Sequence, residues 1–298
     1  MQGSLEKTLI GNIQQQLNAR FGKDVVIKSI SGIGGGCINN ASKLVTSEGD
    51  FFMKWNMHCA PGLFTREAES LAELSSVKNP YLSIPETLAV KEVDDSPGFI
   101  VLEYLEPGYV SGNAEDNLGR GLATIHKKTN NNFGFYHNNY CGSTIQDNSW
   151  NSSWVDFFGQ QRIWHLVGLI QQGKGLPPEH IRIYERLVTK LPELLPSESR
   201  PALIHGDLWS GNYMYTNSGA ALIDPASYYA DREMEMGIMT MFGGFSPRFW
   251  SAYNEIYPLP TDWRERNMLY QLYHILNHYY LFGGGYGSQA IGVAKQYA

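Results

Sequence analysis

Hydrophobic residues in the first third of the chain recur in short runs, as they do in β-strands. Five such runs predict strands, at residues 25–30, 41–46, 51–55, 84–93 and 99–104. Two further stretches, residues 4–20 and 61–76, place their apolar side chains at the spacing of an amphipathic helix. The first third of the chain therefore predicts a β-rich unit that carries two helices.

The pattern becomes helical beyond the turn signal Glu106-Pro107-Gly108. Six stretches predict helices, at residues 113–127, 153–172, 178–194, 232–242, 247–256 and 262–281. Residues 202–223 interrupt them with short apolar strands, and residues 130–153 show neither pattern. A loop of that length is either functional or an insertion. We predict an α+β chain of two lobes, residues 1–106 and residues 107–298, with a ligand held between them.

Composition and charge narrow the classes of protein that fit. Hydrophobic residues make up 43% of the 298 residues, enough for a sizeable core. The net charge is −6 and no basic run exceeds two residues, which argues against a nucleic-acid partner. No apolar stretch reaches the length of a membrane span, about 18 residues. The first residues show no secretory signal, and three cysteines lack metal-ligand spacing; we therefore expect a cytoplasmic protein whose free thiols are Cys37, Cys59 and Cys141.

A glycine cluster joins the first two predicted strands and contains Gly32, Gly34, Gly35 and Gly36. A Walker P-loop or a Rossmann fingerprint would lead into a helix, but a strand follows here. Two interpretations remain: an ordinary flexible hairpin, or a loop that covers nucleotide phosphates as in kinases. We expect Cys37 to be exposed in this loop, and we hypothesise that it forms an intermolecular disulfide under oxidation.

Lys54 lies in the third predicted strand and points to the opposite face from Met53 and Trp55. It either reaches nucleotide phosphates or faces solvent. Glu67 falls on the apolar stripe of the following helix, four residues after Leu63. A buried carboxylate without a partner costs several kcal/mol, so we predict that Glu67 pairs with Lys54.

The strongest signal is the segment Leu203–Asn212, followed by Ala221–Pro225. Asp207 and Asn212 are five residues apart, and Asp224 comes twelve residues later after an apolar strand. Phosphoryl transfer uses one carboxylate to accept the proton of the attacking hydroxyl group, and an amide oxygen with a second carboxylate to hold Mg²⁺ against ATP. Turn preference alone does not explain this order and spacing.

His205 precedes this aspartate, and we expect it to orient the loop rather than to act as a base. It has no second histidine or cysteine near it in the sequence, which argues against a zinc hydrolase or a dinuclear hydrolase.

The His-Gly-Asp motif, with its asparagine and the later Ile-Asp, resembles that of small-molecule kinases such as aminoglycoside and choline phosphotransferases. The fuller string His205–Asn212 is similar to that of the fructosamine kinase (ketosamine 3-kinase) family. Other segments that fit this family lie at residues 34–38, 224–229, 233–235, 241–245 and 270–278. The resemblance implies a two-lobed protein-kinase-like fold with a β-rich N-lobe and a larger α-rich C-lobe. It also implies ATP-dependent phosphorylation of the 3-hydroxyl group of ketosamines, which releases the amine and acts in deglycation.

The same resemblance implies roles for individual residues. Asp207 would be the base, and Asn212 and Asp224 would bind magnesium. Lys54, paired with Glu67, would bind the α- and β-phosphates of ATP. The other nucleotide contacts would come from the glycine loop and the hinge, at Gly34, Gly35, Gly36, Glu103, Tyr104 and Leu105.

Two features depart from protein kinases: a glycine replaces an arginine at Gly206, and Pro225-Ala226 replace Phe-Gly. We therefore expect no activation-loop switch of the protein-kinase type.

Other side chains leave alternatives open. Trp209 lies two residues from the expected base, and either contacts the sugar or its amine or packs its own loop. We interpret Glu233 and Glu235 as acids that stabilise a helix N-terminus rather than as ligands of the substrate's amine.

Two rival functions are a kinase for an aminoglycoside or a choline-like alcohol, and a non-catalytic nucleotide-binding relative. Retention of the whole expected site argues against the second.

Overall fold

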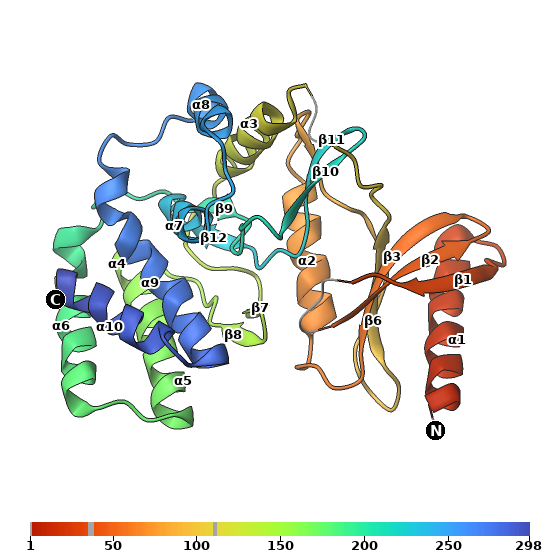
Figure 1. Cartoon of the computed structure of the whole chain (residues 1–298), viewed down its shortest axis with the longest axis horizontal. Coiled ribbons are helices and arrows are strands. Elements are labelled where there is room, and N and C mark those ends of the chain that lie inside the picture. The colour runs from red at the N-terminus through yellow and green to blue at the C-terminus, as the bar shows by residue number, and fades with distance from the viewer. Residues whose placement is uncertain (1, 35–38, 110–111) are drawn as a thin grey trace.

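Two lobes lie side by side in the computed structural model, which describes residues 2–34, 39–109 and 112–298 (Figure 1). The smaller lobe carries a five-stranded sheet, and the larger lobe is built mainly from helices. The sheet has the strand order β1-β2-β3-β6-β5, and all neighbours are antiparallel. Its strands are β1 (Ile27–Gly32), β2 (Asn40–Thr46), β3 (Gly49–Asn56), β5 (Thr87–Lys91) and β6 (Gly98–Glu103).

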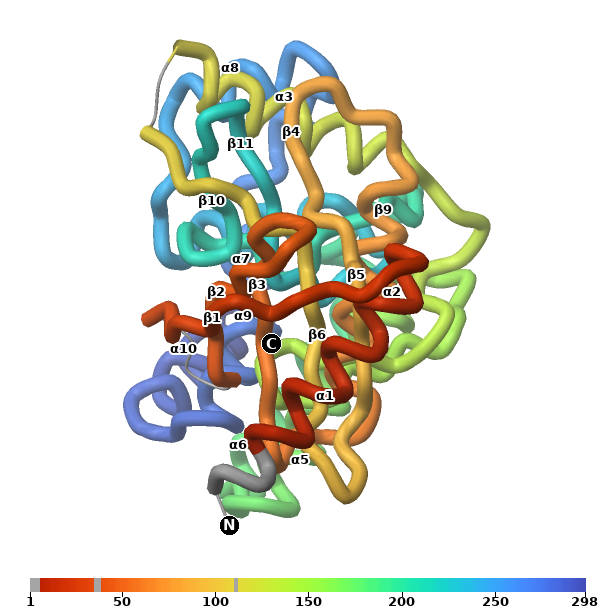
Figure 2. Tube along the Cα trace, turned by 90° about the vertical axis from the view of Figure 1, so that its right-hand side faces the viewer, coloured from red at the N-terminus to blue at the C-terminus, as the bar shows by residue number. Residues whose placement is uncertain are grey.

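Helices cover both faces of this sheet, which explains why its interior strand β6 is apolar along almost its whole length. Phe99 and Val101 pack in one cluster with α1 (Gln2–Phe21), whereas Ile100 and Leu102 pack with α2 (Leu63–Ser75). Figure 2 views the molecule from the side of α1. Since side chains alternate along a strand, Met53 faces α1 and Lys54 faces α2, as the sequence predicts.

The strand predicted at residues 84–93 is present as β5, but its predicted bounds are wrong. The chain instead forms β4 (Leu82–Ser83) and β5, with Pro85 between them. Proline has no backbone N–H to donate, so it interrupts the strand. The short β4 pairs in parallel with β11 (Gly219–Leu222) of the larger lobe. A segment N-terminal to residue 106 therefore contacts the larger lobe, and the boundary at that residue stays a prediction.

Helices of the larger lobe form around a core of aliphatic and aromatic side chains. They are α3 (Ala114–His126), α4 (Trp154–Asp156), α5 (His165–Gly173), α6 (Pro178–Leu194), α7 (Glu233–Met241), α8 (Pro247–Ile256), α9 (Trp263–Phe282) and α10 (Tyr286–Tyr297). A π-helical segment, η1 (Phe157–Trp164), joins α4 to α5 within the helix predicted at residues 153–172. Sequence analysis missed α10. Within the described ranges, no helix has both the length and the apolarity needed to cross a bilayer.

Two strand pairs of the larger lobe position the candidate site. β9 (Ala202–Ile204) pairs with β12 (Tyr228–Ala230), and β10 (Tyr213–Thr216) pairs with β11. The loop from β9 to β10 contains the His-Gly-Asp motif, and the connection from β11 to β12 contains Asp224. A hydrogen bond of 2.9 Å from the Ala226 N–H to the His205 carbonyl joins the two segments. The strand pairs therefore hold the two acidic segments next to each other.

The expectation that residues 130–153 contain no strand is also wrong. These residues form a short hairpin of β7 (Asn139–Cys141) and β8 (Thr144–Gln146). Asn139 donates a hydrogen bond of 2.8 Å to the Ser227 carbonyl, beside the acidic segment of β11 to β12. Three-residue strands are too short to show the alternation by which strands are predicted from sequence.

Candidate active site

Asp207 lies on the loop that follows β9, and Asn212 holds the loop in shape. The Asn212 side-chain amide donates hydrogen bonds to the Asp207 carbonyl at 2.8 Å and to its carboxylate at 3.1 Å. Burial raises the pKa of Asp207 to about 8, and the negative charges of Glu235 and Asp224 add to the rise. The hydrogen bonds from Asn212 and Cys141 oppose it. A raised pKa is typical of a carboxyl group that exchanges protons with a substrate.

His205 orients this loop, as the sequence predicts. Its ring is fully buried, and Nε2 lies 2.8 Å from the Ile223 carbonyl. The backbone N–H of Asp207 donates to Nδ1 at 3.3 Å. Nδ1 is therefore the acceptor and Nε2 the donor, which requires the neutral ring. Burial lowers the pKa of His205 and favours that neutral form.

Glu235 also holds the loop, a role that sequence analysis missed. Its side chain, at 0% exposure, accepts hydrogen bonds from the backbone N–H groups of His205 and Gly206, the latter at 3.1 Å. Gly206 has a φ of 87°, and a Cβ there would lie 2.1 Å from the Ala226 carbonyl oxygen. The sequence does contain a signal: Glu235 stands between Met234 and Met236 in a helix of apolar residues, where a charge needs a partner.

Glu233, two residues earlier in α7, makes a different contact. Its carboxylate accepts two hydrogen bonds of 2.8 Å from Arg266 and is 3% exposed. Neither acid of this helix is therefore accessible to a substrate's amine. The sequence interpretation of both as helix N-terminal acids is correct in position, since both lie in the first turn, but it is incomplete.

Lys54 joins the two lobes through a pair of carboxylates. Its ammonium group lies 2.7 Å from the Glu67 carboxylate and also contacts Asp224. The predicted pair of Lys54 and Glu67 is therefore present. Burial by itself would lower the pKa of Lys54, but the charges of Glu67 and Asp224 hold it above its ordinary value. The lysine is therefore charged at neutral pH.

Asp224 adopts a left-handed backbone conformation that residues other than glycine rarely take. Its φ is 56°, and no other described residue except glycine has a positive φ. Its side chain remains 43% exposed even though it contacts the buried Lys54. Backbone strain of about 1 to 3 kcal/mol at such a residue is typical of functional sites. This carboxylate and the amide oxygen of Asn212 are hard oxygen donors, the ligands that Mg²⁺ prefers.

The glycine loop and the hinge are only partly described. Gly34 is exposed just after β1, and the Ile33 N–H donates a hydrogen bond of 2.9 Å to the Ala41 carbonyl across the hairpin. The other glycine-loop predictions lie outside the described residues: Gly35, Gly36 and Cys37. Glu103 ends β6, and Tyr104 and Leu105 follow it towards the larger lobe.

Four aromatic side chains form a partly exposed row that starts beside Asp207 at Trp209. The Trp209 ring is 6.2 Å from Phe242, Phe242 is 5.4 Å from His278, and His278 is 5.6 Å from Phe282. We call these four residues the aromatic row. Trp209 packs over Gly211, where a Cβ would lie 2.4 Å from the ring, yet it stays 40% exposed. It therefore packs its own loop and still presents a free face.

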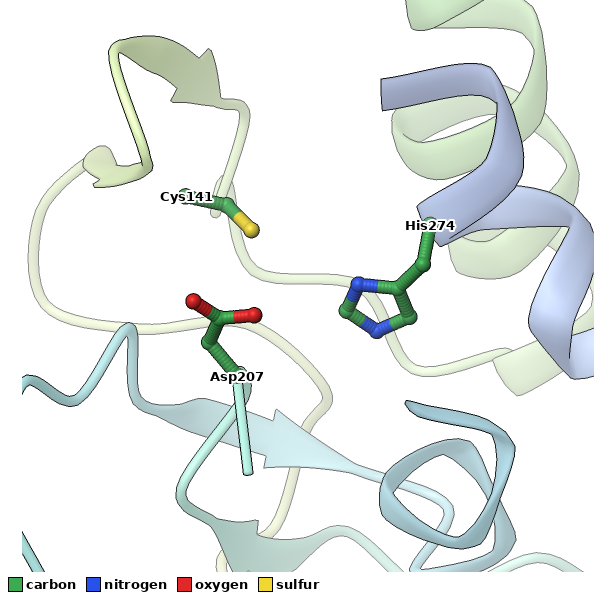
Figure 3. A group of neighbouring side chains, drawn as sticks. All are labelled: Cys141, Asp207 and His274. Carbon is green, nitrogen blue, oxygen red and sulfur yellow. The ribbon is translucent and has the colours of Figure 1, made fainter. Parts of the chain in front are cut away.

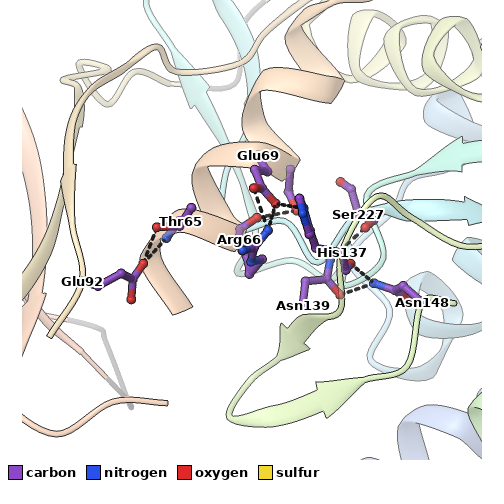
Figure 4. Close-up of polar contacts among 9 residues, drawn as sticks. Thr65, Arg66, Glu69, Glu92, His137, Asn139, Asn148 and Ser227 are labelled. Carbon is purple, nitrogen blue, oxygen red and sulfur yellow. Dashed lines mark hydrogen bonds and ion pairs between the residues drawn. The ribbon is translucent and has the colours of Figure 1, made fainter. Parts of the chain in front are cut away.

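Loop 130–153 connects α2 to the acidic segment. His137 lies 3.1 Å from Glu69 of α2, and Glu69 also pairs with Arg66 (Figure 4). Through Asn139, the same loop reaches Ser227. The helix that carries Glu67 is thus linked to the segment that carries Asp224 both through this loop and through Lys54.

Comparison with known proteins identifies relatives along nearly the whole chain. A family model described as fructosamine kinase matches residues 9–297. The chloroplastic protein-ribulosamine 3-kinase of Arabidopsis thaliana is 37% identical over 283 residues, which cover 93% of this chain and 84% of that protein. The ketosamine-3-kinase of Mus musculus is 32% identical over 296 residues, which cover 90% of this chain and 94% of that protein.

Solved structures show the same architecture. A candidate fructosamine-3-kinase from Haemophilus somnus is 26% identical and has a TM-score of 0.86, with 96% of each chain covered. An aminoglycoside phosphotransferase solved with ADP is 14% identical and has a TM-score of 0.59, with 95% of this chain and 97% of that chain covered. At that identity the second likeness shows the fold alone. The predicted two-lobed, protein-kinase-like α+β fold is confirmed.

Proposed function

Because the chain belongs to the fructosamine kinase family, we propose that it transfers the γ-phosphoryl group of ATP to the 3-hydroxyl group of a ketosamine. The observation that carries this proposal is the contact of Lys54 with Asp224 beside the loop of Asp207 and Asn212. This contact places the ammonium group proposed to bind the nucleotide, from the smaller lobe, next to the proposed metal ligand Asp224 of the larger lobe.

Asp207 is the base in the proposed reaction. The substrate's 3-oxygen attacks the γ-phosphorus, the bond from that phosphorus to the bridging oxygen breaks, and ADP leaves. The proton of the 3-hydroxyl group passes to the Asp207 carboxylate. Glu235 accepts hydrogen bonds from two backbone N–H groups of the loop, a contact that we call the Glu235 clamp. This clamp and the hydrogen bond from Asn212 fix the direction of the Asp207 carboxylate.

Lys54 binds the α- and β-phosphates of ATP, and Glu67 holds its ammonium group in place. Asn212 and Asp224 are the residues that would hold Mg²⁺, and their oxygen donors fit this ion. When bound, Mg²⁺ neutralises charge that develops on the phosphates. The remaining ATP contacts proposed are the glycine loop over the phosphates and the hinge at the adenine, formed by Gly34, Gly35, Gly36, Glu103, Tyr104 and Leu105.

We assign the amine side of the ketosamine to the aromatic row. Trp209 is two residues from the base and presents a free ring face. A ketosamine carries its amine on C1 and its ketone on C2, so a single carbon separates the amine-bearing carbon from C3, whose hydroxyl group is phosphorylated. Aromatic faces attract cationic amines by about 0.5 to 2 kcal/mol. Release of that amine after phosphorylation would make the enzyme part of deglycation.

Kinetic assays of ADP formation test this function. The protein is incubated with ATP, Mg²⁺ and one acceptor at a time: a fructosamine, a ribulosamine, an aminoglycoside or choline. We expect turnover with at least one ketosamine and a kcat/KM at least about a hundredfold lower for the other acceptors. Turnover with an aminoglycoside or choline alone would assign the chain to the rival kinase function. No turnover, with ATP bound, would indicate a non-catalytic relative.

A further inference from the structure

Three potential metal ligands from distant parts of the chain converge beside the candidate base. Cys141 ends β7, Asp207 lies on the loop after β9, and His274 lies in α9. One ligand atom from each lies within 4.8 Å of those of the other two. Figure 3 shows the thiol, the carboxylate and the imidazole ring directed towards a common space. This convergence is invisible in the sequence, where the nearest two of the three are 66 residues apart.

His274 carries the strongest indication that this space accepts a ligand. Its ring is 0% exposed, and among the described residues neither ring nitrogen has a hydrogen-bond partner. A buried polar group without a partner costs about 1 to 3 kcal/mol, and native structures contain few of them. Burial lowers the pKa of His274 to about 3, so the ring is neutral and one nitrogen offers a lone pair. A bound cation would satisfy that nitrogen.

Cys141 directs its thiol towards the same space, and its neighbours fix its position. Its side chain is 2% exposed, and its sulfur accepts a hydrogen bond of 3.3 Å from the Asn277 side-chain amide. The sulfur lies within 4.8 Å of an oxygen of the Asp207 carboxylate. Asn277 lies one helical turn after His274 in α9, so a single helix positions both the imidazole ring and the sulfur.

We propose that Cys141, Asp207 and His274 form an inhibitory zinc site. One thiolate sulfur, one imidazole nitrogen and one carboxylate oxygen are the donors that zinc takes, with a fourth position left for water. Mg²⁺ prefers an all-oxygen shell and is a poor match for this set. Zinc lies about 2.0 to 2.3 Å from such donors, which places tetrahedral ligands roughly 3.3 to 3.6 Å apart. Since the ligand atoms now lie within 4.8 Å of one another, a closure of at most about 1.5 Å forms the site. Binding displaces the thiol proton and the proton that Asp207 carries at neutral pH, and both are released to solvent.

The consequence of zinc binding follows from the role of Asp207. A carboxylate that ligates zinc cannot accept the proton of an attacking hydroxyl group, so the bound ion blocks the reaction. This consequence rests on the proposed function, whereas zinc binding does not. Since Asn212 and Asp224 are not zinc ligands here, added Mg²⁺ or ATP would not displace the ion.

Zinc binding is tested directly, without any activity assay. Competition with a chromogenic chelator measures the affinity of the reduced full chain, and X-ray absorption at the zinc edge identifies the donors. We expect one tight site with one sulfur in its shell. Loss of a group behind a zinc ligand weakens binding about 10- to 100-fold, so Cys141→Ser and His274→Ala should weaken it at least as much. Cys59→Ser is the matched control, since Cys59 is free but outside the cluster, and it should bind zinc as the wild type does.

Absence of a tight zinc site in the wild type would overturn the proposal, and so would a site lost in Cys59→Ser and kept in Cys141→Ser. The X-ray absorption spectrum of the wild type does not depend on how the variants fold, and a shell without sulfur would also overturn it. With a ketosamine substrate, one equivalent of zinc should abolish turnover, and a zinc-selective chelator should restore it. Failure of the chain to turn over any substrate would contradict the proposed function and leave the binding measurement intact.

Discussion

The Glu67 carboxylate lies 2.7 Å from the Lys54 ammonium group, although the two residues belong to a helix and a strand of the smaller lobe. Both side chains are almost fully buried. The same lysine contacts Asp224 of the larger lobe, so one cation is shared by two carboxylates. This arrangement keeps Lys54 charged and aims it at the junction of the lobes.

Replacement of the lysine tests its role with ATP. We expect Lys54→Met to lower kcat/KM for ATP by about 10²- to 10³-fold, the loss typical of one removed electrostatic stabiliser. Steady-state kinetics at varied ATP measure the effect. Lys91→Met is the control, because Lys91 lies in the same sheet but pairs with Asp94 at the surface. Equal kinetics for the two variants would contradict the assignment of Lys54 to ATP.

Glu235 is predicted to act through the loop that it holds. Glu235→Gln keeps the size of the side chain but replaces one acceptor oxygen by an NH₂ group, which faces backbone N–H donors. We expect kcat to fall by about 10- to 100-fold, since misplacement of a base by a fraction of an ångström has effects of this size. KM for ATP should change little, because Glu235 does not contact Lys54, the residue proposed to bind the nucleotide.

Glu233→Gln, in the same helix, is the control that separates an effect on the position of the Asp207 loop from an effect on the stability of the fold. This variant loses the pair with Arg266 and should unfold at a lower temperature, whereas its kcat per folded molecule should match the wild type. A Glu235→Gln variant with normal kcat would show that the clamp is structural only.

Asp231 predicts a pH dependence of stability that is separate from catalysis. Burial and the nearby charge of Glu233 raise its pKa to about 6 from an ordinary value near 4. Between about pH 4 and pH 6 the folded chain therefore binds a proton at Asp231 that the unfolded chain lacks, and the free energy of unfolding falls as pH rises. As pH rises through this window, the free energy of unfolding of Asp231→Asn should increase relative to that of the wild type by on the order of 2 to 3 kcal/mol. Urea unfolding at several pH values measures it, and parallel curves would refute the assignment.

Trp209 is predicted to contact the amine side of the substrate. Trp209→Ala should raise KM for the ketosamine by about tenfold, since an aromatic contact worth roughly 1 kcal/mol or more is lost. KM for ATP should stay constant. The control is Trp150→Ala, which removes a tryptophan of nearly equal exposure, 42% against 40%, that packs against Tyr136 and Tyr229 instead. An unchanged KM in Trp209→Ala would assign this ring to loop packing alone.

Local patterns predicted most of the elements and the acidic motif. Met53 and Lys54 alternate between two helices because strand side chains alternate, and Glu67 pairs with Lys54 because a buried charge needs a partner. Failures arose where long-range packing decides the structure. β4 forms only because the distant strand β11 offers it a partner. The helix α10 follows a run of three glycines and contains two more, which obscures its apolar stripe.

In the candidate site, too, local spacing predicted some residues, whereas contacts between distant elements could not be predicted. Asp207, Asn212 and Asp224 are close in sequence, so their spacing carried the signal. The clamp of Glu235 and the cluster of Cys141, Asp207 and His274 join residues from separate elements, and no spacing rule reports such contacts. The aromatic residues lie mostly in the core of the larger lobe, with the aromatic row at its surface.

One measurement tests the central claim most directly: the position of the new phosphate in the product. A ketosamine is incubated with ATP and Mg²⁺, in parallel with wild-type protein and with Asp207→Asn, and ¹H–³¹P correlation spectroscopy identifies the phosphorylated carbon. We predict a phosphate on the 3-oxygen with the wild type. With Asp207→Asn we predict its formation to be slower by about 10²- to 10⁴-fold, the contribution of a general base. Phosphate on another oxygen, no phosphorylated ketosamine, or an undiminished rate in Asp207→Asn would contradict the account.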